Sequence, residues 1–216
     1  MSSMKQRIFP LAIEILGAYP DGVDYADLAI KVLDGDESLN LNTVAYYLRA
    51  LAEEEPAIVH EPSRFRFRLE TFRDTTAPSS TTPPRRSGMH EANGVEVEIS
   101  DRDKYVRVLC ALVQVTDGGE TTRYAKMAAI MGITYGGQAM GSKVGSLLNK
   151  ICEAEVTLGR PMLSAVVIGY RGRPGAGFYT IARRLDRMKP GEDEVSFWRD
   201  EVGAVYAAWH RPASEA

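Results

Sequence analysis

The chain has 216 residues, of which 44% are hydrophobic and 25% charged, and its formal net charge is −3. These values are typical of a folded chain with one large or two small domains, and they exclude a polycation that coats nucleic acid through its total charge. A local basic surface is still compatible with them, so the distribution of charge along the chain matters more than its sum.

Residues 1–73 carry the pattern of three helices followed by a β-ribbon. Apolar residues at helical spacing predict a first helix that ends near Gly17, and Asp24 is placed as the N-cap of a second. A third helix begins at Asn40 or Asn42. Alternation then predicts a strand that has Phe65, Phe67 and Leu69 on one face and Arg64, Arg66 and Arg68 on the other. This order is that of a winged helix-turn-helix.

The motifs "AIEIL", "YADLA" and "NTV" and the Arg-Phe strand resemble the HARE-HTH domain over residues 5–72. That winged-helix module occurs in chromatin regulators, a bacterial RNA polymerase subunit and some restriction systems. The resemblance implies association with DNA or chromatin, and it also fits a module that binds protein. Asn and Arg pair with base edges, and Thr and Tyr reach phosphates. The residues predicted to contact DNA are Asn42, Thr43, Tyr46, Arg49, Arg64 and Arg66; the alternative is a solvated polar face.

Residues 74–94 are rich in Thr, Ser, Pro and Gly and contain almost no large apolar side chains. Burial cannot offset the entropy of ordering such a stretch, so we expect a flexible linker between two domains. Arg85 and Arg86 within it either contact a phosphate backbone or serve solubility.

Residues 95–216 repeat the plan of the first domain. A short stretch of alternating apolar residues at 95–99 leads into three helices. Ser100 or Asp101 is the predicted N-cap of the first of them. The stretch from Leu163 to Arg184 then predicts a hairpin with an Arg-Gly-Pro tip. We therefore expect a mainly α fold with small β-hairpins (α+β), made of two tandem winged helix-turn-helix domains. The final amphipathic helix carries an aromatic stripe that packs on its own domain or binds a second copy or another protein.

The motifs "TTRYAKMAAIMG", "AMGSKVGSLL" and "RPMLSAVVIGYRGRPGAGF" resemble the DNA-binding domain of O6-alkylguanine-DNA alkyltransferases and alkyltransferase-like proteins over roughly residues 118–178. Tyr124 matches the family's nucleotide-rotating tyrosine, and Ser142 or Lys143 its intercalating arginine. Ser164 and Ala165 stand where the family has its reactive cysteine and histidine. Alkyl transfer needs a thiolate beside a base, so the resemblance implies DNA binding without dealkylation.

Cationic residues between Arg123 and Lys189 far outnumber the acidic ones, which is typical of a phosphate-contacting surface. The alternative for the hairpin is an ordinary solvated turn. Residues predicted to contact DNA in this domain are Arg123, Tyr124, Ser142, Lys143, Lys150, Arg171, Arg173, Arg183 and Arg184.

No metal and no cofactor is expected, because His60, His90 and His210 lack ligand spacing and "GRPGAG" lacks a GK[ST] ending. Cys110 and Cys152 fit buried positions in a reducing compartment. No segment resembles a signal peptide or a membrane helix. We expect a cytoplasmic, nucleoid-associated bacterial protein: a non-catalytic double-stranded DNA-binding regulator, or an accessory factor of a defence or modification system. The alternative is an adaptor in which one winged helix binds a partner protein.

Overall fold

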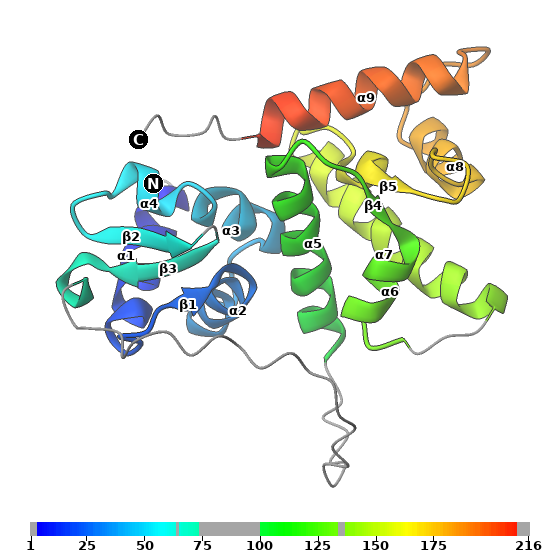
Figure 1. The fold of residues 1–216 in the computed structure, drawn as a ribbon. Helices are drawn as coiled ribbons and strands as arrows, with labels where there is room; N and C mark the ends of the chain where they lie inside the picture. Colours follow the sequence, from blue (N-terminus) through cyan, green and yellow to red (C-terminus); the bar gives the residue numbers. More distant parts are fainter. Residues whose placement is uncertain (1–3, 64, 74–99, 134–136, 211–216) are drawn as a thin grey trace, which may run out of the picture.

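The computed structural model describes residues 4–63, 65–73, 100–133 and 137–210. It is mainly helical and has a small antiparallel three-stranded sheet, as the α+β expectation required (Figure 1). The predicted linker at 74–94, the apolar lead-in at 95–99 and Arg64 lie outside the described residues.

The first half contains the three expected helices and then a pair of strands, and it adds a two-residue strand before the second helix and a short fourth helix. Its sheet has the antiparallel order β1-β3-β2. Helix α3 begins after Asn40, whose side chain accepts a hydrogen bond from the Thr43 amide at 3.1 Å, so Asn40 rather than Asn42 is the N-cap. The elements are α1 (Met4–Gly17), β1 (Val23–Asp24), α2 (Tyr25–Gly35), α3 (Leu41–Leu48), α4 (Leu51–Glu54), β2 (Val59–Ser63), β3 (Arg66–Leu69) and the 3₁₀ turn η1 (Glu70–Phe72).

The second half begins with a helix capped by Ser100, whose hydroxyl accepts from the Asp103 amide at 3.0 Å. Its two short strands pair in parallel, Thr122 with Val167 and Arg123 with Ile168. The elements are α5 (Asp101–Asp117), β4 (Thr122–Arg123), α6 (Tyr124–Ile130), α7 (Gly137–Thr157), the 3₁₀ turn η2 (Leu163–Val166), β5 (Val167–Ile168), α8 (Ala176–Arg184) and α9 (Glu194–Trp209).

The hairpin predicted from Leu163 to Arg184 is wrong. Its first arm is η2 followed by the two-residue β5, and its second arm is the helix α8. Four residues that alternate, 178–181, cannot separate a strand from one turn of a helix. The buried side chains of α8 are Phe178, Tyr179, Ile181 and Ala182, a helical stripe, and the arginines that follow suit a helix C-terminus.

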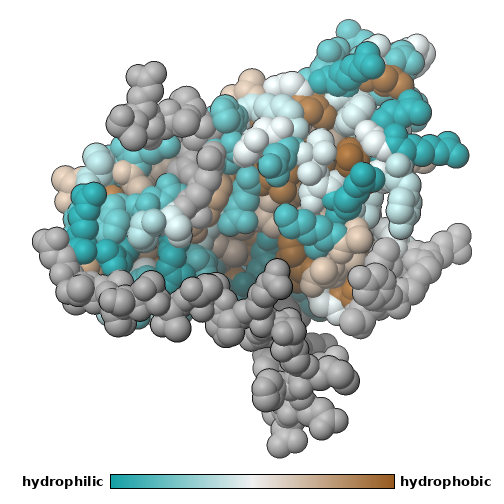
Figure 2. All heavy atoms as spheres, viewed as in Figure 1, coloured by the Kyte–Doolittle hydropathy of each residue, from teal (hydrophilic) through white to brown (hydrophobic). Residues whose placement is uncertain are grey.

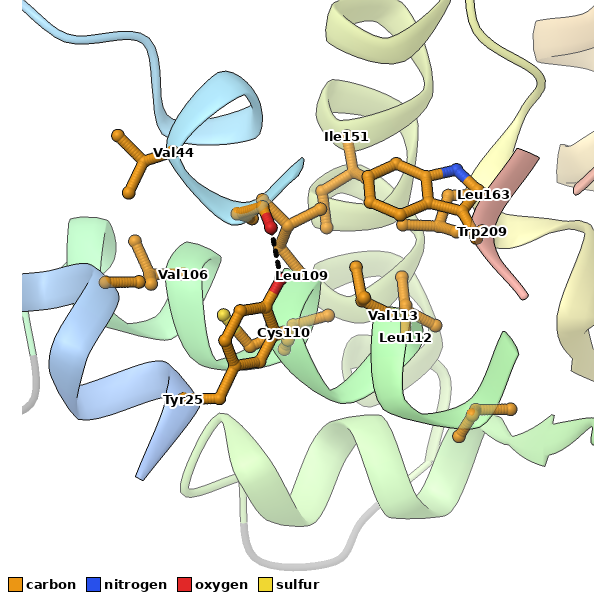
Figure 3. Packing of buried hydrophobic residues seen from close by; sticks show 14 of the residues in the cluster. Tyr25, Val44, Val106, Leu109, Cys110, Leu112, Val113, Ile151, Leu163 and Trp209 are labelled. Carbon is orange, nitrogen blue, oxygen red and sulfur yellow. Dashed lines mark hydrogen bonds between the residues drawn. The ribbon is translucent and has the colours of Figure 1, made fainter. Parts of the chain in front are cut away.

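Helix α5 lies between the two halves and contacts both (Figure 1). On one side it packs on α2 and α3, and on the other on α6, α7, η2 and α9. Figure 3 shows how its apolar side chains meet Tyr25 and Val44 from the first half and Ile151, Leu163 and Trp209 from the second. One continuous apolar core therefore joins the halves.

A buried polar network crosses the same junction. Glu155 on α7 is fully buried, and its carboxylate accepts from Arg160 at 2.6 and 2.8 Å. The Asn42 amide nitrogen on α3 donates to Glu155 at 2.5 Å, and the Tyr105 hydroxyl on α5 donates to the Asn42 oxygen at 2.6 Å. The carboxylate thus obtains a counter-charge and hydrogen-bond donors, which burial of a charge requires.

Next to this network, two guanidinium groups flank two aromatic rings. Tyr46 on α3 lies edge-to-face on Trp209 of α9, with 5.5 Å between ring centroids. Arg49 lies 4.8 Å and Arg160 5.0 Å from the Tyr46 centroid, and both also lie within 5.7 Å of the Trp209 centroid. These cation–π contacts fix the end of α9 against α3. The aromatic stripe of α9 was predicted to pack on its own domain or to bind a partner. In the structure Phe197 packs on Phe178 of the second half, whereas Trp209 packs on Tyr46 of the first half.

Replacement of Glu155 by Ala should destabilise the chain by about 3 kcal/mol, because the buried Asn42 and the half-buried Arg160 would lose their acceptor. Glu153, two residues earlier on the same helix, pairs with Arg184 in a more exposed position. Glu153→Ala is the matched control and should cost less than about 1 kcal/mol. Urea unfolding of both variants measures the difference; equal effects would show that the junction network does not stabilise the fold.

Stability should also depend on His60. Its Nε2 accepts from Arg68 at 3.2 Å, which requires an unprotonated nitrogen, and burial holds its pKa below the ordinary 6.5. Because the folded pKa lies below the unfolded one, the unfolded chain takes up a proton first as the pH falls. Stability should therefore be fully present above pH ~6.5 and decline toward pH ~5. Thermal unfolding across this range should show a smaller decline for His60→Gln; an equal decline would contradict the assignment.

Candidate nucleic-acid interface

Helix α3 was predicted to contact DNA, but in the structure the side chains of Asn42, Tyr46 and Arg49 contact the second half. Asn42 is 1% exposed and is held by Glu155 and Tyr105, so its prediction as a base-reading residue is wrong. Tyr46 and Arg49 stack with Trp209, and Arg49 also donates to the Ala208 carbonyl at 3.4 Å. Glu155, which accepts the hydrogen bond from Asn42, lies 113 residues away in the sequence, so no local pattern could reveal the contact.

Two other residues of the first half that were predicted to contact DNA, Thr43 and Arg66, are partly engaged in contacts within the protein. Thr43 is half-buried in the first turn of α3. Arg66 pairs with Asp24 at 3.0 Å and donates to the carbonyls of Asp21 and Gly22. These bonds hold β3 against the loop before β1, which gives Arg66 a structural role.

In the second half, intramolecular ion pairs neutralise part of the predicted basic surface. Arg160 is bound by Glu155, Arg183 by Glu194 at 2.7 Å, Arg184 by Glu153 and Arg187 by Glu201 at 2.9 Å. Arg183 and Arg184 are therefore weaker candidates for phosphate contact than their positions in the sequence suggested.

Other cations of this half have no carboxylate within ion-pair distance among the described residues, and all of them are exposed. Figure 2 shows hydrophilic side chains standing out from the edge of the molecule where Figure 1 places α8 and the turn before it. The exposed cations without such a carboxylate are Arg123, Lys126, Lys143, Lys150, Arg171, Arg173, Lys189 and Arg199.

Three of these cations gather at the turn between β5 and α8, residues 169–175, which we call the cationic turn. Its backbone is closed by hydrogen bonds from the Gly169 amide to the Arg173 carbonyl (2.8 Å) and from the Gly172 amide to the Gly169 carbonyl (3.1 Å). Arg123, at the start of α6, donates to the Gly169 carbonyl at 2.7 Å. Arg171 and Arg173 are exposed on a fixed support.

Glycine is needed at one place in this turn. Gly172 has a φ of +71°, which side-chain-bearing residues rarely adopt, and a Cβ built there would meet no atom within 4 Å. No side chain therefore stands between Arg171 and Arg173, which leaves room for the backbone of a ligand to approach the turn closely.

Tyr124 contacts the end of the cationic turn at Gly175. Its ring is half-buried, and burial raises the pKa of its hydroxyl, which interacts with the backbone of Gly175. The sequence placed Tyr124 among the DNA-contacting residues; the structure places it where the turn joins α8.

A second basic group lies near Met131, at the C-terminal end of α6, a helix about 10 Å long. Lys143 and Lys150 of α7 share with Lys104 of α5 a hollow of about 450 Å³. Ser142 is exposed near the start of α7. Lysines from two helices thus line one depression together with Asp101, which pairs with Lys104 at 3.4 Å.

Ser164 occupies the position matched to the alkyltransferases' reactive cysteine. Its hydroxyl lies 2.8 Å from the Cys152 sulfur, and both residues are buried. Burial raises the pKa of Cys152 to about 11, so the thiol stays protonated at neutral pH. This pair joins α7 to η2 and does not present a nucleophile. No sequence pattern indicated this contact, because the two residues belong to different elements.

Within the described ranges, no group of three or more His, Cys, Asp or Glu side chains is arranged to hold a metal ion. Nor does any helix in those ranges have the length and apolar character needed to cross a membrane. Comparison of the chain with family models, curated proteins and solved structures finds no match.

Proposed function

We propose that the protein binds double-stranded DNA without catalysis and that the cationic turn makes the principal phosphate contacts. The observation that carries the proposal is the pair Arg171 and Arg173, exposed, without an intramolecular counter-ion among the described residues, and held on a hydrogen-bonded turn. Arginine is suited to phosphate because its planar donors match the oxygen geometry.

The neighbourhood of the turn supports the same function. Lys126, one turn into α6, and Lys143 and Lys150 on α7 add exposed positive charge at both ends of α6. A surface of this kind gains affinity by releasing counter-ions from the phosphate backbone, whatever the base sequence. A regulator or an accessory factor of a defence or modification system would fit such a protein.

No catalytic step is part of the proposal. Ser164 shares its hydrogen bond with a protonated thiol and is 6% exposed, which supports a role in packing. The packing of α3 on the second half gives no support to base reading by that helix. We therefore assign the affinity to the second half of the chain.

Replacement of Arg171 and Arg173 together by Ala should weaken binding to every duplex alike and reduce the slope of log affinity against log salt by roughly one to two. Fluorescence anisotropy of the full chain with two unrelated duplexes, at several salt concentrations, measures this.

The matched control is Arg183→Ala with Arg184→Ala, which changes the net charge equally. Since Glu194 and Glu153 already neutralise these arginines, the salt slope should stay close to that of the wild type. An unchanged slope for the Arg171 and Arg173 variant, or an equal drop in both, would refute the cationic turn as the phosphate-binding surface.

A further inference from the structure

Tyr170, within the cationic turn, has the highest relative exposure of the large apolar side chains among the described residues. Its relative exposure is 105%, whereas the next most exposed, Met4, has 44%. An aromatic ring normally contributes to a fold by burying its faces. The Tyr170 ring has both faces in solvent.

The backbone explains how the ring is held there. Tyr170 follows Gly169, whose amide and carbonyl are both bonded, the first to Arg173 and the second to Arg123 and Gly172. These bonds hold the backbone beside Tyr170 and thereby set the direction in which its side chain leaves the turn. A ring with two exposed faces, on a hydrogen-bonded turn and with a guanidinium on the next residue, offers a flat group a surface on which to stack.

We propose that Tyr170 stacks on an unpaired nucleobase, so that the cationic turn prefers DNA in which a base has left the helical stack. This inference rests on the proposed DNA binding, and it specifies the kind of DNA site that the protein prefers. Base–aromatic stacking tolerates any base, because each has a π-face. Inside an intact duplex, neighbouring bases cover both faces of each base. Only a base that has left the stack has a face free to stack on the tyrosine ring.

The positions of the arginines agree with this arrangement. Arg171 and Arg173 lie on either side of Gly172 in the sequence, and they would bind the phosphates that flank the unstacked base while the ring covers the base itself. A protein partner is the alternative occupant for an exposed tyrosine. The uncompensated positive charge around Tyr170 favours a ligand that combines a flat apolar face with anionic groups, which is a nucleotide.

The test uses the full chain and a duplex that carries one unpaired 2-aminopurine, together with the same duplex without the extra base. Stacking on an aromatic ring quenches 2-aminopurine, so the probe reports on this contact directly. The wild type should quench the probe and bind the bulged duplex about 5- to 100-fold more tightly than the intact one. Tyr170→Ala should lose the quenching and the preference but keep its affinity for the intact duplex.

Two further variants separate stacking from other causes. Tyr170→Phe keeps the ring and should retain the preference, whereas Tyr170→Leu keeps only apolar bulk and should lose it. Equal binding of both duplexes by the wild type, or an equal loss on both in Tyr170→Ala, would overturn the stacking proposal and leave DNA binding intact. If the wild type binds neither duplex, the proposed function itself fails, and the stacking proposal with it.

Discussion

The whole arrangement depends on the need to bury helix α5 on nearly all sides. Between Val106 and Asp117 its buried positions include five of the six residues from 108 to 113, which point around the full circumference of a helix. One layer of helices cannot cover such a surface. The first half covers one side and the second half the other, so the two halves form a single core although the sequence suggests two domains.

This shared core decides what each half can do. The helix that would read bases in a winged helix-turn-helix, α3, is used instead to close the junction through Asn42, Tyr46 and Arg49. A buried ion pair and its hydrogen bonds add little net stability compared with apolar packing, but they tolerate few alternative arrangements. The exposed charge that remains for a partner lies mainly on α6, α7 and the cationic turn.

Local signals predicted the local structure well. Short-range patterns limited each of two helix caps to a pair of candidates, and the structure selects Asn40 for α3 and Ser100 for α5. The hairpin failed because four alternating residues fit a helix equally well. The ion pairs of Arg183 and Arg184 and the burial of Asn42 depend on residues distant in the sequence, so counting charges overestimated the basic surface and the reach of α3.

Amide hydrogen exchange of the full chain, with and without duplex DNA, tests the central claim most directly: that α3 is used within the protein while the cationic turn is free for a ligand. The account predicts slow exchange over residues 41–48 in the free protein, unchanged by DNA, and new protection at residues 169–177 when DNA is added. Fast exchange of α3 in the free protein, with protection gained there on DNA and none at the cationic turn, would contradict it.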